Sequence, residues 1–308
     1  MTAEELVRSG IDPRGDTCAH PWIFATEMLK QVSRTFALNI QVLPNARLRK
    51  PILLAYLFCR MADTVEDSPT LSPAEKKHLL SLFAEIFSAD RQNWQERALA
   101  FVNELPTSWG KSQDAEEYLC AHCVWALALH FQFSARVQAP IAQCVREMCA
   151  GMADFALRQV RQEGQWLSID SEDDLDRYCY FVAGVVGNML CDLFFIQSSF
   201  ITPARHARMK ALAVSFGLAL QLVNIIKDAA EDSSREVCFI PMDWQRAEGI
   251  EHPQALFSSE TDLNPRKRIM QRMVRKAWRH LQDARDFTLL IPIFEPRIRL
   301  FCQWPMLM

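Results

Sequence analysis

Apolar residues recur every three or four positions along most of the chain, whereas sustained alternation of polar and β-branched residues is hard to find. The first spacing matches one face of an α-helix, and the second would indicate strands. Prolines interrupt the pattern and mark helix boundaries. We place such boundaries at Pro44, Pro51, Pro69, Pro73, Pro106, Pro140, Pro203, Pro241 and Pro265. About nine or ten helical segments lie between them, so the pattern predicts an all-α protein.

Two helix starts are visible in the residue order. Ser72 precedes Pro73 and stands three positions before Glu75, which predicts an N-cap and a capping box. Thr202 before Pro203 is a weaker signal of the same kind. No linker rich in Gly, Ser or Pro divides the chain, so we expect a single domain over residues 1–308.

Composition narrows the class of protein. The formal net charge is -3, which provides no overall basic field and argues against nucleic acid as a partner. Ten scattered cysteines indicate reduced thiols in a cytoplasmic protein. The N-terminus carries Glu4, Glu5 and Arg8 where a secretory signal would have a basic segment and an apolar run, so we expect no export.

The most apolar stretch runs from Cys179 to Ile196. Asn188 and Asp192 interrupt it, which favours a buried core helix over a transmembrane segment. Gly184 and Gly187 in this stretch do not form a dinucleotide-binding fingerprint, because no strand precedes them. We expect them to allow close packing of helices.

A first acidic motif ends the apolar helix that runs from Leu53 to Asp67. Asp63 and Asp67 are four residues apart and share one helix face. Their charges repel, and an inward-facing pair needs a cation because an unpaired buried carboxylate is very costly. Magnesium suits this pattern, since it takes one or two carboxylates and binds substrate phosphates with its other positions. Arg60 lies near the same face, where its planar guanidinium suits a diphosphate oxygen.

A second acidic motif repeats the arrangement. Asn224, Asp228 and Asp232 recur every four residues on one helix face and offer three oxygen ligands in a row. Gln221 lies one turn earlier, and Lys227 is a nearby cation.

A single pair of aspartates at this spacing is usually a solvated helix face. Here two motifs each follow an apolar helix, and each has basic neighbours, Arg60 for the first, and Lys227 and Arg235 for the second. The repetition favours binding of magnesium and diphosphate over a solvated face.

Four blocks together resemble the squalene/phytoene synthase family, the head-to-head prenyltransferases. Their residues are closer to those of the squalene branch. They are Ser33 to Phe36, Tyr56 to Asp67, Tyr178 to Gly187 and Gln221 to Pro241. The resemblance extends from about Ser33 to about Trp304. It implies the isoprenoid synthase fold, with helices around a central apolar cavity.

The resemblance also implies a role for each block. Magnesium would bind on two walls of the cavity, through Asp63 and Asp67 on one wall and Asn224, Asp228 and Asp232 on the other. Tyr178 would assist ionisation or proton removal, with Asp63 and Asp228 as catalytic aspartates. The substrate-binding residues would be Ser33, Arg34, Phe36, Tyr56, Arg60, Gln221, Lys227 and Arg235.

The implied reaction is the magnesium-dependent condensation of two farnesyl diphosphates through presqualene diphosphate, ending at squalene with NADPH as hydride donor. NADPH would approach near Arg34, Asn224 and Arg235. Nearby alternatives stop at presqualene diphosphate or use geranylgeranyl diphosphate to make phytoene. An alternative of another class is a non-catalytic assembly protein with the same fold, which the intact aspartates argue against. Substrates this apolar also leave open a peripheral contact with membranes.

Three departures from the family pattern stand out. Lys227 replaces a more common arginine and loses bidentate contact with phosphate. Phe287 stands where many members have a tyrosine near the diphosphate. The chain ends soon after Trp304, where relatives continue, so we expect a shortened C-terminus and weaker closure of the cavity.

Overall fold

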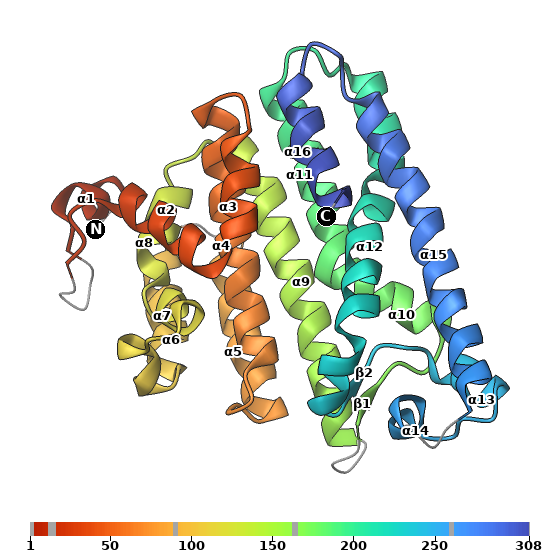
Figure 1. The fold of residues 1–308 in the computed structure, drawn as a ribbon. Coiled ribbons are helices and arrows are strands. Elements are labelled where there is room, and N and C mark those ends of the chain that lie inside the picture. The colour runs from red at the N-terminus through yellow and green to blue at the C-terminus, as the bar shows by residue number, and fades with distance from the viewer. Residues whose placement is uncertain (1–2, 12–16, 89–91, 162–165, 259–261, 308) are drawn as a thin grey trace.

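The computed structural model describes residues 3–11, 17–88, 92–161, 166–258 and 262–307, and these are almost entirely helical (Figure 1). The first half contains α1 (Ala3–Ser9), α2 (Pro21–Val32), α3 (Arg34–Gln41), α4 (Ala46–Asp67), α5 (Pro73–Ile86), α6 (Trp94–Glu104), the 3-10 helix η1 (Thr107–Lys111), α7 (Ala115–Ala121) and α8 (Cys123–His130). The all-α prediction is confirmed.

The second half contains the longest helices together with several short ones. They are α9 (Ala135–Arg161), α10 (Glu172–Cys179), the π-helix η2 (Tyr180–Gly184), α11 (Val185–Gln197), α12 (Pro203–Ser234), α13 (Met242–Ala247), α14 (Pro253–Phe257), α15 (Leu263–Leu290) and α16 (Pro296–Met306). Short helices such as α13 and α14 were missed by the sequence analysis, which expected nine or ten segments. A helix of five to eight residues completes too few turns to show a periodic apolar face.

Helix α9 runs through the middle of the molecule (Figure 1). It packs against α4 and α5 on one side and against α11 on the other, while α12 packs against α11 and α15. One cluster of buried apolar residues therefore extends from Leu6 in α1 to Cys302 in α16. The expectation of a single domain over residues 1–308 stays a prediction.

Two short strands lie near the lower ends of α9 and α12 in Figure 1. Strands β1 (Leu167–Ser168) and β2 (Val237–Cys238) pair in parallel, with Leu167 opposite Val237. The chain reaches β2 through Glu236, which has a φ of 59°, in the left-handed region that non-glycine residues rarely adopt. This turn follows directly after Arg235 and fixes the direction in which the chain leaves the second acidic motif.

The predicted helix starts are confirmed. Ser72 and Glu75 form a complete capping box at the start of α5, and Thr202 caps α12. Two proline boundaries were wrong, because Pro51 lies inside α4 and Pro140 inside α9. Each lies in the second turn, where the carbonyl left without a donor belongs to an exposed residue and can be solvated.

Two helical stretches are long and apolar enough to cross a membrane by length and composition, namely Glu172–Gln197 and Pro203–Ser234. About half of each apolar window is buried inside the molecule, at 50% and 44%. Core helices of soluble proteins pass the same test, and both stretches pack against each other here. The expectation of no transmembrane segment stays a prediction.

Candidate active site

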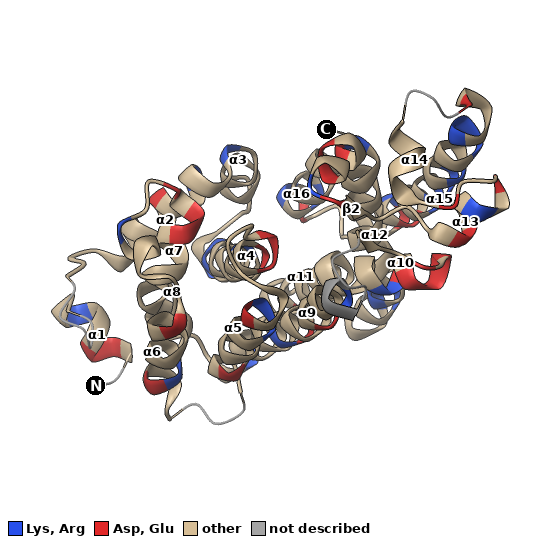
Figure 2. Ribbon diagram, turned by 90° about the horizontal axis from the view of Figure 1, so that it is seen from below, with Lys and Arg blue, Asp and Glu red and all other residues tan. Residues whose placement is uncertain are grey.

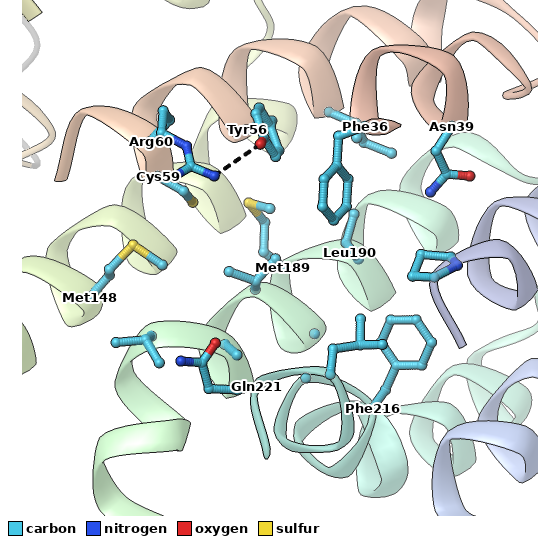
Figure 3. Close-up of a pocket in the computed structure, with 18 of the residues that line it drawn as sticks. Phe36, Asn39, Tyr56, Cys59, Arg60, Met148, Met189, Leu190, Phe216 and Gln221 are labelled. Carbon is cyan, nitrogen blue, oxygen red and sulfur yellow. Dashed lines mark hydrogen bonds between the residues drawn. The ribbon is translucent and has the colours of Figure 1, made fainter. Parts of the chain in front are cut away.

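A cavity of about 210 Å³ lies between α3, α4, α11 and α12, and α16 closes part of it. Figure 3 shows its length: Arg60 and Gln221 lie toward one end, and Asn39 and Phe216 toward the other. Between them the walls are mainly apolar, with Phe36, Leu190 and Met189 pointing inward. The cavity thus has a polar end and an apolar end. Its polar end belongs to the two helices that carry the acidic motifs.

Arg60 is the main cation at the polar end. Its Nη2 donates to the hydroxyl of Tyr56 at 3.2 Å, and its Nη1 lies 3.9 Å from Asp63 Oδ2. Burial works to lower the pKa of Arg60, but Asp63, Tyr56 and Glu116 together raise it above its usual value. Nε is buried and has no hydrogen-bond partner among the described residues. The guanidinium therefore stays charged at the polar end of the cavity.

The ring of Phe36 continues this wall. Phe36 lies in the first turn of α3, which Ser33 caps by accepting a hydrogen bond from the Phe36 N–H at 3.2 Å. Its ring lies 5.0 Å from the ring of Tyr56. The cap and the ring contact fix the apolar wall directly beside the Arg60 guanidinium.

The carboxylates of the first motif have too little positive charge around them. Burial raises the pKa of Asp63 to about 7; the charge of Arg60 lowers it, and Asp67 and Glu116 raise it further. Glu66, between the two aspartates, also has a raised pKa, first through burial and then through Asp67 and Asp63. Figure 2 shows acidic residues on α4 near the centre of the molecule.

The second motif lies on the last turns of α12. Gln221 and Asn224 line the same cavity as Arg60 and Asp63, so parts of both predicted walls border one space. Asp228 is partly exposed, with Lys227 Nζ 3.6 Å from its Oδ1. Lys227 itself is 70% exposed and does not line the cavity.

Arg235 connects the two motifs. Its Nη2 donates to Asp232 Oδ1 at 2.6 Å, and its Nη1 lies 3.5 Å from Asp67 Oδ1. Asp232 is buried, and burial raises its pKa; Arg235 lowers it, while Asp228 and Asp67 raise it. Arg235 thus already holds one oxygen of the Asp232 carboxylate.

The donor set fits magnesium bound together with a diphosphate. Among the described residues, no group of three or more His, Cys, Asp or Glu side chains is close enough to hold a metal by itself. Magnesium does not need such a cage, because one or two carboxylates and the substrate phosphates suffice. The incomplete neutralisation of Asp63, whose pKa is raised although Arg60 is near, is the feature that a divalent ion would relieve.

Tyr178 lies in the core beside the acidic motif. It is 5% exposed, its ring stacks on Phe239 at 4.4 Å, and it does not line the cavity. Burial, and then the charges of Glu66 and Asp67, raise its pKa well above the usual value. The phenol is therefore neutral, so it is suited to donate a hydrogen bond or a proton and unsuited to accept one as an anion.

The predicted residues fall into two groups. Those that line the cavity are Phe36, Tyr56, Arg60, Asp63, Gln221 and Asn224. Those that do not are Ser33, Arg34, Asp67, Tyr178, Lys227, Asp228, Asp232 and Arg235. Asp67 and Arg235 line a second cavity of about 330 Å³ together with Glu66 and Lys76. The acidic motifs therefore border two hollows, and the first has the more apolar lining.

Two features of the site were missed by the sequence analysis. Glu116 in α7 lies 3.8 Å from Arg60 Nη1, and nothing in the sequence indicates that α7 meets α4. The π-helix η2 is the other; its residues Val182 and Ala183 line the cavity. A π-turn inside a longer helix often marks a functional site.

The expectation for Phe287 was wrong. Its ring is buried against the ring of Phe216 at 5.2 Å, and Phe216 lies toward the apolar end of the cavity (Figure 3). Phe216 is twelve residues before Asp228 on the same helix, or about 18 Å along its axis. A tyrosine at position 287 would thus lie far from the acidic motifs.

Comparisons with known proteins agree with this geometry. Residues 29–308 match the family model described as squalene/phytoene synthase. Squalene synthase 1 of Arabidopsis thaliana is 31% identical over 293 residues, which cover 93% of this chain and 63% of that protein. Squalene synthase BSS of Botryococcus braunii is 32% identical over 289 residues, covering 92% of this chain and 56% of that protein. The chain spans about three fifths of the length of these relatives.

Solved structures support the fold. A ligand complex of TcSQS superposes with a TM-score of 0.75 at 24% identity, covering 92% of this chain and 75% of that one. Squalene synthase HpnC from Alicyclobacillus acidocaldarius gives a TM-score of 0.61 at 16% identity, covering 93% and 89%. Together with the family match over almost the whole chain, these findings show that the protein belongs to the squalene/phytoene synthase family.

Proposed function

We propose that this chain condenses two prenyl diphosphates head to head, with farnesyl diphosphate as substrate and presqualene diphosphate as the first product. One observation carries the proposal: residues of both acidic helices, Asp63 and Asn224, line the polar end of one cavity whose remaining walls are mainly apolar. A prenyl diphosphate has the same division into a charged head and an apolar chain.

The residues around the cavity suit the first step. As the first diphosphate leaves with the electron pair of its carbon–oxygen bond, Arg60 stabilises the charge that develops on its oxygens. Tyr56 holds the guanidinium in place. Bound magnesium would supply further electrostatic stabilisation of the leaving group.

The carbon left behind is an allylic cation. Phe36 and Leu190 exclude water from it, so the double bond of the second prenyl chain attacks instead. Loss of a proton to the departed diphosphate then closes the cyclopropane ring of presqualene diphosphate. We assign the neutral phenol of Tyr178 to assist ionisation, because it lies near the acidic motif and cannot act as an anionic base there.

The cavity must widen to hold two chains. Its volume of about 210 Å³ is below the ~300–1,000 Å³ of typical pockets for small molecules. We infer that the walls move apart when substrate binds.

We further propose that the second step yields squalene with NADPH as reductant. The direct test is to incubate the protein with farnesyl diphosphate and magnesium, with and without NADPH, and to identify the products by mass spectrometry. Squalene formed only with NADPH would support the full proposal. Presqualene diphosphate under both conditions would restrict it to the first step.

The alternatives have their own outcomes. Phytoene formed from geranylgeranyl diphosphate, with farnesyl diphosphate untouched, would change the substrate and keep the reaction class. No turnover of either substrate would favour a non-catalytic assembly protein. Retention of Asp63, Asp67, Asn224, Asp228 and Asp232 argues against that last alternative.

We propose a cytoplasmic protein that makes peripheral contact with membranes. Phe200, before α12, and Phe294, before α16, are 51% and 69% exposed, and their rings lie 5.5 Å apart. Ile293 beside them is 69% exposed. Clustered exposed aromatic and aliphatic side chains are suited to the boundary between headgroups and acyl chains.

A further inference from the structure

Helix α16 contains a carbonyl group that its own backbone cannot pair. In an α-helix the N–H of one residue donates to the carbonyl four positions earlier. The residue four positions after Phe301 is Pro305, which lies inside α16 and has no N–H. The Phe301 carbonyl therefore needs a donor from outside the helix.

Asn39 of α3 supplies that donor. Its Nδ2 donates to the Phe301 carbonyl at 3.1 Å across 262 positions of sequence. Asn39 is 1% exposed, and its Oδ1 has no hydrogen-bond partner among the described residues. A buried amide with one unpaired atom is unfavourable in an apolar wall. The hydrogen bond from Asn39 Nδ2 to α16 is the interaction that explains why an amide stands at this position.

This bond lies at the apolar end of the cavity. Asn39, Phe301 and Pro305 all line it, and Figure 3 shows Asn39 at the end away from Arg60. A prenyl chain whose diphosphate is held near Arg60 would extend toward this end. The position of α16 therefore limits how far the chain can reach.

The wall has solvent behind it. Pro305 is half-buried, and Gln303 on the same helix and Leu307 directly after it are exposed. The last turn of α16, after the buried Phe301 and Cys302, thus has room to move outward. The Asn39 bond to the Phe301 carbonyl ties the start of this turn to α3.

We propose that Asn39 is a positioning residue that fixes α16 as the end wall of the cavity and so sets the longest prenyl chain that the protein accepts. The proposal rests on the function proposed above, because it assumes that a prenyl chain occupies the cavity. It assigns to Asn39 a role in specificity that does not require contact with the reacting atoms.

The experiment measures binding rather than turnover. Dissociation constants are determined by calorimetry, with magnesium, for the S-thiolodiphosphate analogues of the farnesyl and geranylgeranyl chains, which do not ionise. The variant Asn39→Leu keeps the branching of the side chain at Cγ and removes the donor. We expect the affinity for the longer analogue, relative to the shorter, to rise at least about fivefold, or about 1 kcal/mol.

A second substitution tests the link to Pro305. Pro305→Ala restores a helix N–H for the Phe301 carbonyl, so the Asn39 bond becomes dispensable. In that background Asn39→Leu should change the affinity ratio by less than about twofold, giving a coupled pair of mutations. Equal effects of Asn39→Leu in both backgrounds would overturn the proposal.

The matched control is Gln138→Leu. Gln138 is also a buried amide, and its Nε2 donates to the Phe131 carbonyl at 3.2 Å, but it does not line the cavity. It should lower the melting temperature and leave the affinity ratio unchanged. Asn39→Gln provides a second test if Asn39→Leu does not fold. It keeps the donor and moves it outward by one methylene, so it too should raise the affinity for the longer analogue relative to the shorter.

The outcomes separate the two proposals. If the wild-type protein binds neither analogue, the proposed function fails and this inference fails with it. If the wild type binds them but no folded Asn39 variant changes the ratio by more than about twofold, only this inference is overturned.

Discussion

Arg235 Nη1 lies 3.5 Å from Asp67 Oδ1, so a residue that follows α12 is paired with the last residue of α4. The same guanidinium donates to Asp232 at 2.6 Å. Arg235 thus neutralises one carboxylate from each acidic motif. We infer that a bound magnesium ion and diphosphate would take over this role and release Arg235 toward the diphosphate.

Replacing Arg235 by Gln should therefore make the protein more dependent on magnesium. Arg235 is about half exposed, so the loss in folding free energy without magnesium should be at most about 1 kcal/mol, or a fall in Tm of roughly 2–4 °C. Magnesium alone should stabilise the variant more than the wild type in a thermal shift assay, because the ion replaces the lost positive charge beside Asp67 and Asp232. Arg285→Gln, which removes an exposed pair with Asp286, is the control, and equal magnesium shifts in both variants would contradict the bridging role.

Replacing Asp63 or Asp228 by Ala should abolish turnover while the helical fold is retained. Each removes a carboxylate that we assign to magnesium, and loss of a group that stabilises the leaving diphosphate costs at least about 10²–10³-fold in kcat. Steady-state rates with farnesyl diphosphate and circular dichroism spectra check this. Asp286→Ala, an exposed carboxylate paired with Arg285, should keep its activity; full activity in either motif variant would rule out the model of two magnesium-binding walls.

Replacing Gly217 by Ala should destabilise the packing of α12 against η2 and the start of α11. A Cβ at Gly217 would lie 2.1 Å from the carbonyl oxygen of Ala183, and one at Gly187 would lie 1.9 Å from that of Ala213. Backbone atoms cannot retreat as a flexible side chain does, so we expect a loss of about 1–3 kcal/mol or more in unfolding free energy. Urea denaturation measures it. Gly110→Ala, where a Cβ meets no atom within 4 Å, should change stability by less than about 0.5 kcal/mol.

Replacing Asp174 by Asn should lower stability at neutral pH and have little effect in acid. Arg158 Nη2 donates to Asp174 Oδ1 at 2.6 Å, and both side chains are largely buried. Burial works to raise the pKa of Asp174, but Arg158 and the Asp170 N–H outweigh it and hold the pKa below its usual value. A lowered folded pKa stabilises the protein above the unfolded value of about 3.9 and loses that effect as the pH falls through the folded value.

We expect Asp174→Asn to cost about 1–3 kcal/mol at pH 7, and the difference from wild type to shrink below about pH 3.9. Denaturation series at several pH values measure this. The control is Asp154→Asn, which removes a more exposed pair with Arg177. A difference that stays constant down to pH 3 would show that the charge of Asp174 is not what stabilises α10.

Replacing Phe200 and Phe294 together by Ser should weaken binding to lipid vesicles. Both rings are exposed and lie side by side, so their loss removes apolar area that would enter the bilayer boundary. Co-sedimentation with phosphatidylcholine and phosphatidylglycerol vesicles measures it. Trp278→Ser, which removes a 62% exposed ring in the middle of α15, is the control; no vesicle binding by the wild type would refute the peripheral contact.

The sequence alone determined the fold class and the acidic motifs. Apolar residues at helical spacing required helices with one buried face, and the spacing of Asp63 and Asp67 placed both on one side of α4 because helix geometry is local. The same local rule placed Asn224, Asp228 and Asp232 on one face of α12. Caps such as Ser72 were predicted for the same reason, since their bonds span three residues.

Only the tertiary structure decided which of these groups meet. The contacts of Arg235 with Asp67, of Glu116 with Arg60 and of Asn39 with the Phe301 carbonyl join residues far apart in sequence. Such pairs are set by how the helices pack, and packing depends on the fit of all buried side chains at once. The wrong expectation for Phe287 has the same origin. The position of Phe287 in the sequence does not indicate which end of the cavity its side chain approaches in the fold.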